Sequence, residues 1–439
     1  MEQAKKLLSS GLVVISGTLI GSAFSYLYNM MMGRMLGPVE YGELASLLSL
    51  VTIVAVASGA ILTISMRFAG ELFGLKNFLG IKRVLKTFSK YSIFLGIILV
   101  LVCFLLINPI KDFLSIDKTI PLVIAFSSFV FLFPIMVNRG IIQGIQKFLP
   151  LTVVNSLEMA IRLLLGVLLV KLGFDLSGAL LGFVLATALA YVITFWPLKK
   201  IISLPEKSSD AQLHFNKKEV LSYSWPTLVT ALFLVVGINL DILLVKHFFP
   251  AEQAGIYAAI STIGKIIFYA LGPLISVMFP LISEKRARGE KHYQTFFLSL
   301  ALTVVIGVLA VGVYSTVPGF IIKILYGSQY LSFYYLLPQV GIFILFYTLI
   351  NLIANYFMAV KDFNFLWFYG GVLIAMYLVL ESYHPNLTMV LRVFTSGFGL
   401  LFALMIGYYL FTKRAQIKSL IKGTYGEEFT EIVNNNPGL

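Results

Sequence analysis

The stretch NMMMGRMLGPVEYG, residues Asn29–Gly42, decides how the chain begins to fold. It follows a long apolar run, residues 11–32, and it places an arginine, a Gly-Pro pair and a glutamate where that run ends. Glycine and proline interrupt helices, and proline also fits the first turn of a new helix. We therefore expect this stretch to be a hairpin that ends one membrane-spanning helix and lets the next begin at once.

The composition of the 439 residues is that of an integral membrane protein. Hydrophobic residues make up 59% of the chain, charged residues only 12%, and the mean hydropathy is +0.93. A soluble domain has about twice this share of charged residues. The apolar runs have the length of helices rather than of the roughly ten-residue strands of an outer-membrane barrel, so we predict an all-α fold.

Apolar windows long enough to cross a bilayer recur along the whole chain, and they predict about twelve transmembrane helices. The Gly-Pro hairpin separates the first two. The predicted spans are residues 11–32, 43–65, 91–110, 120–138, 151–170, 176–198, 222–245, 255–281, 295–317, 334–358, 366–382 and 389–411.

The positive charge predicts the orientation of these helices. If the N-terminus is cytoplasmic, 24 of the 33 Lys and Arg residues fall in inside segments and 6 fall in outside segments. Such a bias places the basic loops on the cytoplasmic side. We therefore expect a multi-pass protein of the cytoplasmic membrane with both termini cytoplasmic. The net charge of +13 then needs no nucleic-acid partner.

The chain divides into two similar halves. The longest polar stretch, residues 199–219, separates a predicted six-helix bundle, residues 1–198, from a second one, residues 220–411, and a tail follows at 412–439. The opening stretch has a partner in DILLVKHFFPAEQAG, residues 241–255, where an offset of 212 aligns Asn29 with Asp241, Arg34 with Lys246 and Pro38 with Pro250. An even number of helices per half implies pseudo-twofold symmetry and a site between the bundles.

Two ionisable residues lie in the middle of the fifth predicted span. Glu158 and Arg162 are four residues apart, so they share one face of a helix. Charged groups inside a membrane are costly and mark functional sites. They also neutralise one another as pairs that hold helices together. The sequence leaves both interpretations open.

Other charges at membrane depth extend this set. Lys265 lies near the middle of the eighth span and has no carboxylate one turn away, so it needs a partner on another helix, water or a ligand. Asp241 lies toward the outer end of the seventh span, where it either has a functional role or pairs with Lys246. Arg392 opens the last span, at the interface or in the lumen.

The sequence contains no motif for covalent or metal chemistry. It has no Walker lysine loop, no HExxH, no dinucleotide fingerprint and no paired cysteines, and its four histidines are scattered. The single cysteine, Cys103, lies in an apolar run where it is expected to pack. We therefore expect no cofactor, no bound metal and no enzymatic activity.

At this point the first motif resembles that of the Wzx-type oligosaccharide flippases of the multidrug/oligosaccharidyl-lipid/polysaccharide exporter superfamily. The second copy around Pro250, the basic linker and NYFMAVKDF near Asn355 are also similar to that family. The residues that carry the motif are Asn29, Arg34, Leu36, Gly37, Pro38, Glu40, Tyr41 and Gly42.

The resemblance implies two six-helix bundles that alternate access around a cationic cavity. The implied cargo is a glycan on a polyprenyl diphosphate, and the implied partners are that lipid-linked glycan and the membrane lipids. Among the residues, Arg34 is carried over from the motif, while Arg162, Lys265 and Arg392 fit a cationic substrate site by their chemistry. Glu158 and Asp241 are the candidate coupling carboxylates, for H⁺ or Na⁺, and the protein is expected to be a monomer.

Two alternatives compete with the flippase, one from the same superfamily and one from a different class of protein. A cation-coupled drug antiporter of the same superfamily would have carboxylates rather than Arg and Lys at depth, and here basic residues match or outnumber acidic ones. A polysaccharide polymerase or ligase would need a large external loop with clustered catalytic residues, which the sequence lacks.

Overall fold

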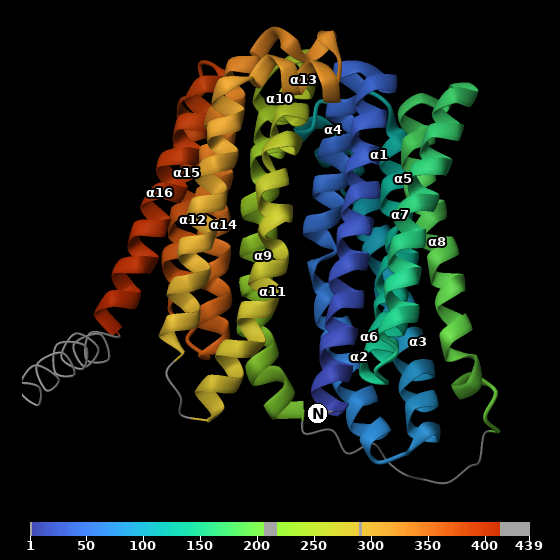
Figure 1. Cartoon of the computed structure of the whole chain (residues 1–439). Coiled ribbons are helices and arrows are strands. Elements are labelled where there is room, and N and C mark those ends of the chain that lie inside the picture. Colours follow the sequence, from blue (N-terminus) through green and yellow to red (C-terminus); the bar gives the residue numbers. More distant parts are fainter. Residues whose placement is uncertain (1, 206–216, 289–291, 413–439) are drawn as a thin grey trace, which may run out of the picture.

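The protein is described by a computed structural model that covers residues 2–205, 217–288 and 292–412, and it is an all-helical membrane protein (Figure 1). The predicted tail beyond residue 412 and most of the predicted linker lie outside the described residues. The described part forms two bundles that stand side by side, with the first half of the chain in one bundle and the second half in the other.

The first bundle is built around a long bent helix, α1, which packs on α7. Within it α2 packs on α6 and α7 packs on α8. Its elements are α1 (Glu2–Val54), α2 (Val56–Gly74), α3 (Phe78–Leu105), α4 (Ile107–Phe113), α5 (Thr119–Ser127), α6 (Phe129–Gly144), α7 (Phe148–Leu169), the π-helical turn η1 (Val170–Phe174) and α8 (Asp175–Ile202).

The second bundle is built around α14, which is buried along most of its length and packs on α11, α12 and α16. This burial fits a helix that is apolar on every side. The elements are α9 (Lys217–Phe248), α10 (Ala251–Gly264), α11 (Ile266–Ala287), α12 (Tyr293–Thr316), α13 (Pro318–Leu325), the 3₁₀ segment η2 (Ser328–Leu336), α14 (Leu337–Ala359), α15 (Phe365–Ser382) and α16 (Leu387–Thr412).

The prediction of about twelve spans is confirmed. Ten segments in the described residues are long and apolar enough to cross a membrane. One of them, residues 148–202, turns back at Gly173, where φ is 86°, and so holds two spans. The first arm of α1 is the remaining span. Several spans are made of two collinear helices, such as α5 with α6 and α10 with α11.

The predicted hairpin lies at Gly37 and Pro38. Gly37 has φ 75° and ψ 176°, a conformation that favours glycine, and the two arms of α1 meet there. Helix continues on both sides of this residue, so the first span ends four residues later than residue 32, the predicted boundary. The second arm reaches Val54, and α2 prolongs the same span after a break at Ala55.

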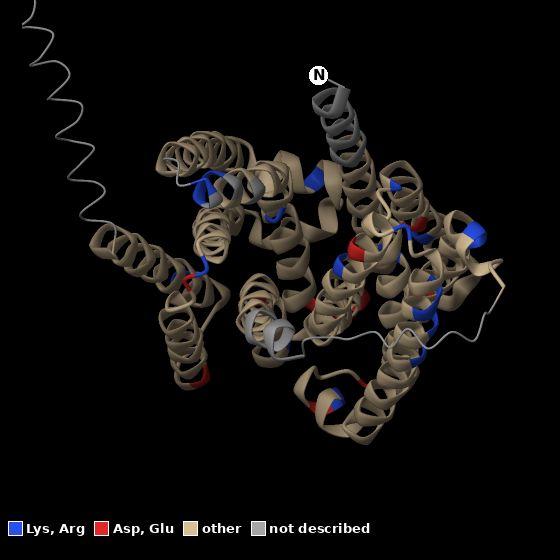
Figure 2. Cartoon of the chain, turned by 90° about the horizontal axis from the view of Figure 1, so that it is seen from below, with Lys and Arg blue, Asp and Glu red and all other residues tan. Residues whose placement is uncertain are grey.

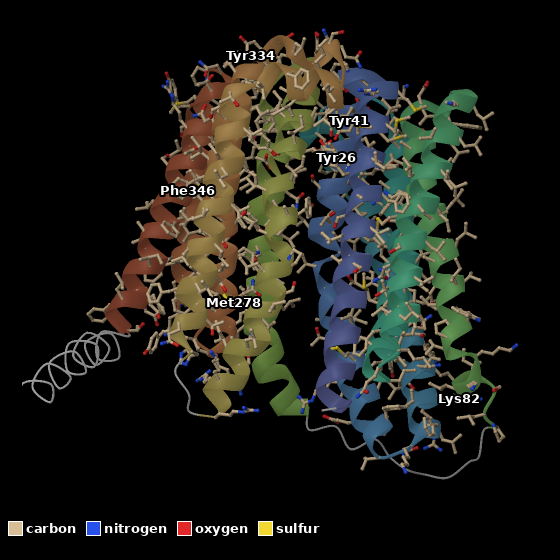
Figure 3. All side chains as sticks on the ribbon, in the orientation of Figure 1. Tyr26, Tyr41, Lys82, Met278, Tyr334 and Phe346 are labelled. Carbon is tan, nitrogen blue, oxygen red and sulfur yellow. The ribbon has the colours of Figure 1, made fainter. Side chains whose placement is uncertain are left out.

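The two ends of the molecule differ in charge. One end carries the connections near residues 75–77, 145–147 and 360–364, and we call it the basic end; Figure 2 shows its Lys and Arg residues. We call the opposite end, which carries Gly37 and α13, the motif end. Figure 3 places Lys82 at the basic end and Tyr334 at the motif end, while Tyr41 lies just below the latter.

The bundles meet mainly through α1. This helix belongs to the first bundle, yet it packs on α10 and α9 of the second. The largest apolar core includes residues of both bundles, such as Tyr41 of α1 and Tyr257 of α10, and both of these side chains are fully buried. The site therefore has to be sought along α1.

Candidate functional site

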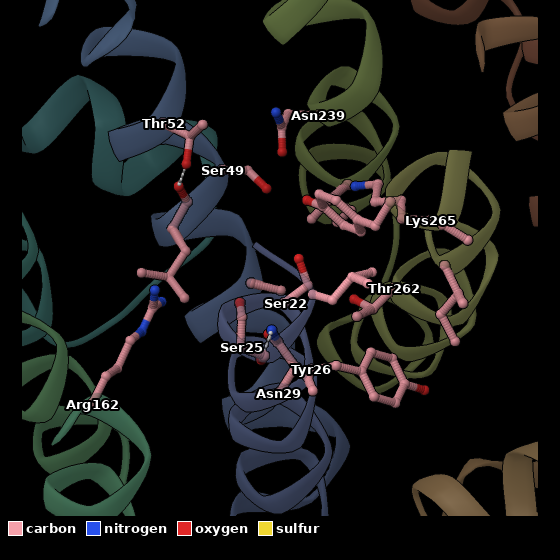
Figure 4. Close-up of a pocket in the computed structure, with 18 residues that line it drawn as sticks. Ser22, Ser25, Tyr26, Asn29, Ser49, Thr52, Arg162, Asn239, Thr262 and Lys265 are labelled. Carbon is pink, nitrogen blue, oxygen red and sulfur yellow. Dashed lines mark hydrogen bonds between the residues drawn. The ribbon is translucent and has the colours of Figure 1, made fainter. Parts of the chain in front are cut away.

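A cavity of about 480 Å³ lies between the two bundles (Figure 4). Helices α1 and α7 line it from the first bundle, and α9, α10 and α11 line it from the second. Hydroxyl and amide groups both donate and accept hydrogen bonds, so such a wall suits a polar ligand or water. The uncharged polar lining consists of Ser22, Ser25, Tyr26, Asn29, Ser49, Thr52, Asn239, Thr262 and Tyr269.

Two cationic side chains complete this wall, and they come from opposite bundles. Arg162 of α7 and Lys265, which lies between α10 and α11, both line the cavity. None of the described residues that line it is an aspartate or a glutamate. The cavity is therefore a polar chamber with positive charge on two walls, and this arrangement is suited to an anion.

Lys265 lies at the junction of α10 and α11, and helical hydrogen bonds continue through it, from its N–H to the carbonyl of Ser261 and from the N–H of Tyr269 to its own carbonyl. α10 ends at Gly264 and α11 begins at Ile266, and together they form the span Ala251–Ser283, with Lys265 near its middle. Its Nζ lies 3.7 Å from Oδ1 of Asp241 on α9. The partner that the sequence required is thus a carboxylate on a neighbouring helix.

Asp241 is fully buried behind the cavity wall. Its other oxygen, Oδ2, accepts hydrogen bonds from the hydroxyls of Tyr257, at 3.1 Å, and Ser261. The alternative pairing of Asp241 with Lys246 is wrong, because Lys246 faces Glu43 of the first bundle, with Nζ 3.9 Å from Oε1. Asp241 therefore contacts the cavity through Lys265.

Arg162 lies between two aromatic rings. Its guanidinium carbon is 4.5 Å from the ring centre of Tyr28 and 4.4 Å from that of Phe183, and such contacts stabilise the cation. Its Nε is buried and has no hydrogen-bond partner. None of the ion pairs in the described part of the chain includes Arg162, so its charge stays available to the cavity.

The hypothesis that Glu158 neutralises Arg162 is wrong. Glu158 instead accepts a hydrogen bond from Nη2 of Arg139 on α6, and its Oε1 accepts another from the hydroxyl of Thr187 on α8, at 3.1 Å. A buried carboxylate needs a cation beside it, and the packing of α7 on α6 brings Arg139 to Glu158. The side chain of Glu158 serves packing among α6, α7 and α8, and the cavity lining does not include it.

The remaining two predicted residues lie elsewhere. Arg34 is exposed at the motif end, where its Nε donates to the carbonyl of Leu325 at 3.0 Å and its Nη2 donates to that of Ile324. Arg392 is exposed on α16. Neither lines the cavity. The structure therefore brings together Arg162 and Lys265 and leaves Arg34 and Arg392 outside the chamber.

Sequence reasoning missed the neutral lining, although the repeat contains a signal for it. With the one-residue insertion in the second copy of the motif, Thr52 aligns with Lys265, just as Asn29 aligns with Asp241. Thr52 and Asn29 both line the cavity. The first bundle thus presents neutral polar groups where the second presents an ion pair.

Comparison with known proteins identifies a family for the chain. A protein-family model described as "Polysaccharide biosynthesis protein" matches residues 7–286. A search of curated proteins found no match.

Among solved structures, the chain is similar to an inward-facing conformation of a multidrug resistance MATE family transporter of the MOP superfamily, with a TM-score of 0.76, 11% identity, and coverage of 94% of this chain and 99% of that chain. For the outward-facing conformation of such a transporter, the TM-score is 0.65 at 14% identity, with coverage of 94% of this chain and 96% of that chain. For the MATE multidrug transporter DinF-BH, the TM-score is 0.66 at 16% identity, with coverage of 93% of this chain and 96% of that chain. These likenesses establish the fold of twelve spans in two bundles.

Proposed function

Since the chain belongs to the polysaccharide biosynthesis protein family, we propose that it is a flippase for a lipid-linked oligosaccharide. It moves a glycan attached to a polyprenyl diphosphate across the cytoplasmic membrane by alternating access, for the synthesis of a surface polysaccharide. The diphosphate and the glycan pass through the cavity, and the prenyl tail stays in the lipid. A transporter of this superfamily, rather than an enzyme, is what the family and the fold support.

One observation carries this proposal: Arg162 and Lys265 enter a single chamber from opposite bundles. A diphosphate has several anionic oxygens, and Arg and Lys bind them with charge-assisted hydrogen bonds. The hydroxyl and amide side chains around them suit the hydroxyls of a sugar. Because the two cations belong to different bundles, a ligand that binds both would respond to any relative motion of the bundles.

The orientation of the protein follows from the charge of its two ends. We propose that the basic end faces the cytoplasm, so that both termini are cytoplasmic and the motif end faces outward. The higher similarity to an inward-facing transporter than to an outward-facing one supports a cavity that opens toward the basic end. An inside-negative potential then favours outward movement of the anionic cargo, by about 2.3 kcal/mol per charge for each 100 mV.

Asp241 is the better placed of the two proposed coupling carboxylates. A diphosphate bound to Lys265 would draw its ammonium away from Asp241 and leave a buried carboxylate without its cation. A proton or Na⁺ taken up by Asp241 would then restore neutrality. Glu158 has no such link to the cavity, so we assign it to the packing of the first bundle.

The second candidate function, a cation-coupled drug antiporter, is favoured by the structural likeness to MATE transporters alone. A binding site for cationic drugs would present carboxylates to the cavity. The described lining presents Arg162 and Lys265 instead. A transport assay with cationic dyes separates the two functions, and we expect no gradient-driven dye movement.

The flippase is tested with purified protein in vesicles that contain a fluorescent polyprenyl-diphosphate oligosaccharide. Arg162→Ala and Lys265→Ala are each expected to slow transfer to the opposite leaflet by about tenfold or more, since each removes charge-assisted hydrogen bonds to the diphosphate. Arg392→Ala is the matched control, because it removes an exposed cation outside the cavity. Transfer at the unmodified rate by both cavity variants would contradict the proposal.

A further inference from the structure

At the motif end the two bundles touch through the two copies of the repeated motif. Gly42 of the first copy and Gly255 of the second meet back to back. A Cβ on Gly42 would lie 2.8 Å from the Cα of Gly255, and a Cβ on Gly255 would overlap the carbonyl oxygen of Pro38. Neither position has room for any side chain. Close backbone approach of this kind is how small residues hold membrane helices together.

A layer of tyrosines lies next to the glycine contact and forms the roof of the cavity. The hydroxyl of Tyr41 is hydrogen-bonded to Thr262, at 3.2 Å, and to Tyr326, at 3.0 Å. Tyr330 donates to the carbonyl of Gly33, at 2.7 Å. Thr262 and Tyr26 line the cavity, and Figure 3 shows Tyr41 between Tyr26 and the motif end, so this layer lies between the cavity and that end. Each of these bonds joins one bundle to the other.

Charged groups flank the same contact and again link the two bundles. Lys246, which is 1% exposed, faces Glu43 across the interface. Arg34 donates to the last carbonyls of α13, those of Ile324 and Leu325, where the helix dipole favours a cation. Arg34 and Lys246 are aligned positions of the repeat. Both copies of the motif therefore use a cation at the same position to hold the opposite bundle.

We propose that the two copies of the motif form the gate at the motif end, and that the Gly42–Gly255 contact sets how closely it shuts. The aligned glycines of the two copies meet each other, as equivalent positions do at the axis of a symmetric dimer. When the bundles rock, the glycine contact, the tyrosine layer and the cation contacts separate together. This role rests on the alternating access and the orientation proposed above, but it is independent of the cargo.

The test adds a methyl group at the glycine contact and measures how accessible the cavity becomes from outside. In a background with Cys103→Ser, a reporter cysteine at Ser22→Cys lines the cavity, and a membrane-impermeant maleimide is added from the outer side of cells. Gly255→Ala forces a methyl group against the backbone of the opposite bundle, which destabilises the closed state. We expect the reporter to be labelled about tenfold faster. Gly59→Ala is the matched control, because nothing lies within 4 Å of its added Cβ.

A charge swap gives a second, independent measurement. Lys246→Glu places a carboxylate opposite Glu43, so the repulsion should also raise outside labelling. The double variant with Glu43→Lys restores opposite charges and should return labelling to within about twofold of the background.

The outcomes separate the gate from the cargo. Faster labelling with Gly255→Ala, or a rise with Lys246→Glu that the double swap reverses, supports the gate even if no lipid-linked glycan is flipped. If Gly255→Ala does not accumulate in the membrane, the charge swap decides. Unchanged labelling in every gate variant that does accumulate would overturn the inference.

Discussion

Each bundle contains a buried ion pair between its own helices, and the two pairs are placed differently. In the first bundle, Glu158 and Arg139 face one another among α6, α7 and α8, away from the cavity lining. In the second, Asp241 is buried but its partner Lys265 lines the cavity. The difference teaches that charge at membrane depth does not by itself identify a site. What matters is whether one partner can exchange the other for a ligand.

The largest expected effect is on stability in the first bundle. Glu158→Gln removes the charge that neutralises Arg139, and arginine cannot release its proton, so an uncompensated charge stays buried. We expect a loss of about 3–5 kcal/mol in the free energy of unfolding. Thermal unfolding in detergent measures it, and Arg139→Met added to Glu158→Leu should recover most of the loss. A Glu158→Gln protein as stable as the unmodified one would mean that the pair is not structural.

The isosteric change in the second bundle is expected to affect transport more than stability. In Asp241→Asn, Lys265 loses its carboxylate but can face the cavity or release a proton, as a lysine does readily when buried. We expect a smaller loss of stability than in Glu158→Gln. Transfer of the lipid-linked glycan should fall about tenfold and lose its dependence on an imposed ion gradient. If transfer stays gradient-dependent in this variant, Asp241 is not the coupling carboxylate.

The smallest expected effect comes from changing the shape, but not the charge, of the Arg162 side chain. Arg162→Lys keeps the charge but loses the planar group that lies between Tyr28 and Phe183. Because a partly buried cation–π contact contributes about 1 kcal/mol, transfer should fall by only a few fold. Comparison with Arg162→Ala in the same vesicles separates charge from stacking. Equal losses in the two variants would mean that stacking, rather than charge, determines the role of Arg162.

The sequence predicted the spans and the break at Gly37 because both depend on local properties: apolar length and backbone preference. It could not predict the pairings. The i,i+4 spacing placed Glu158 beside Arg162, but the rotation of α7 turned Glu158 toward Arg139, nineteen positions away in the chain. Likewise, Ser and Thr are ordinary in membrane helices, so nothing local marked Thr52 as a cavity residue. These features depend on which helix faces meet.

Helix α1 carries out two tasks at once. It provides ten of the eighteen residues that line the cavity, and it also carries Arg34, Tyr41, Gly42 and Glu43 at the gate. A substitution on this helix can therefore disturb both the cavity and the gate, while a substitution on the lipid-facing surface disturbs neither. Among relatives that handle different glycans, we expect residues 19–52 to diverge most slowly overall, with changes concentrated at the neutral cavity positions where cargo preference is adjusted.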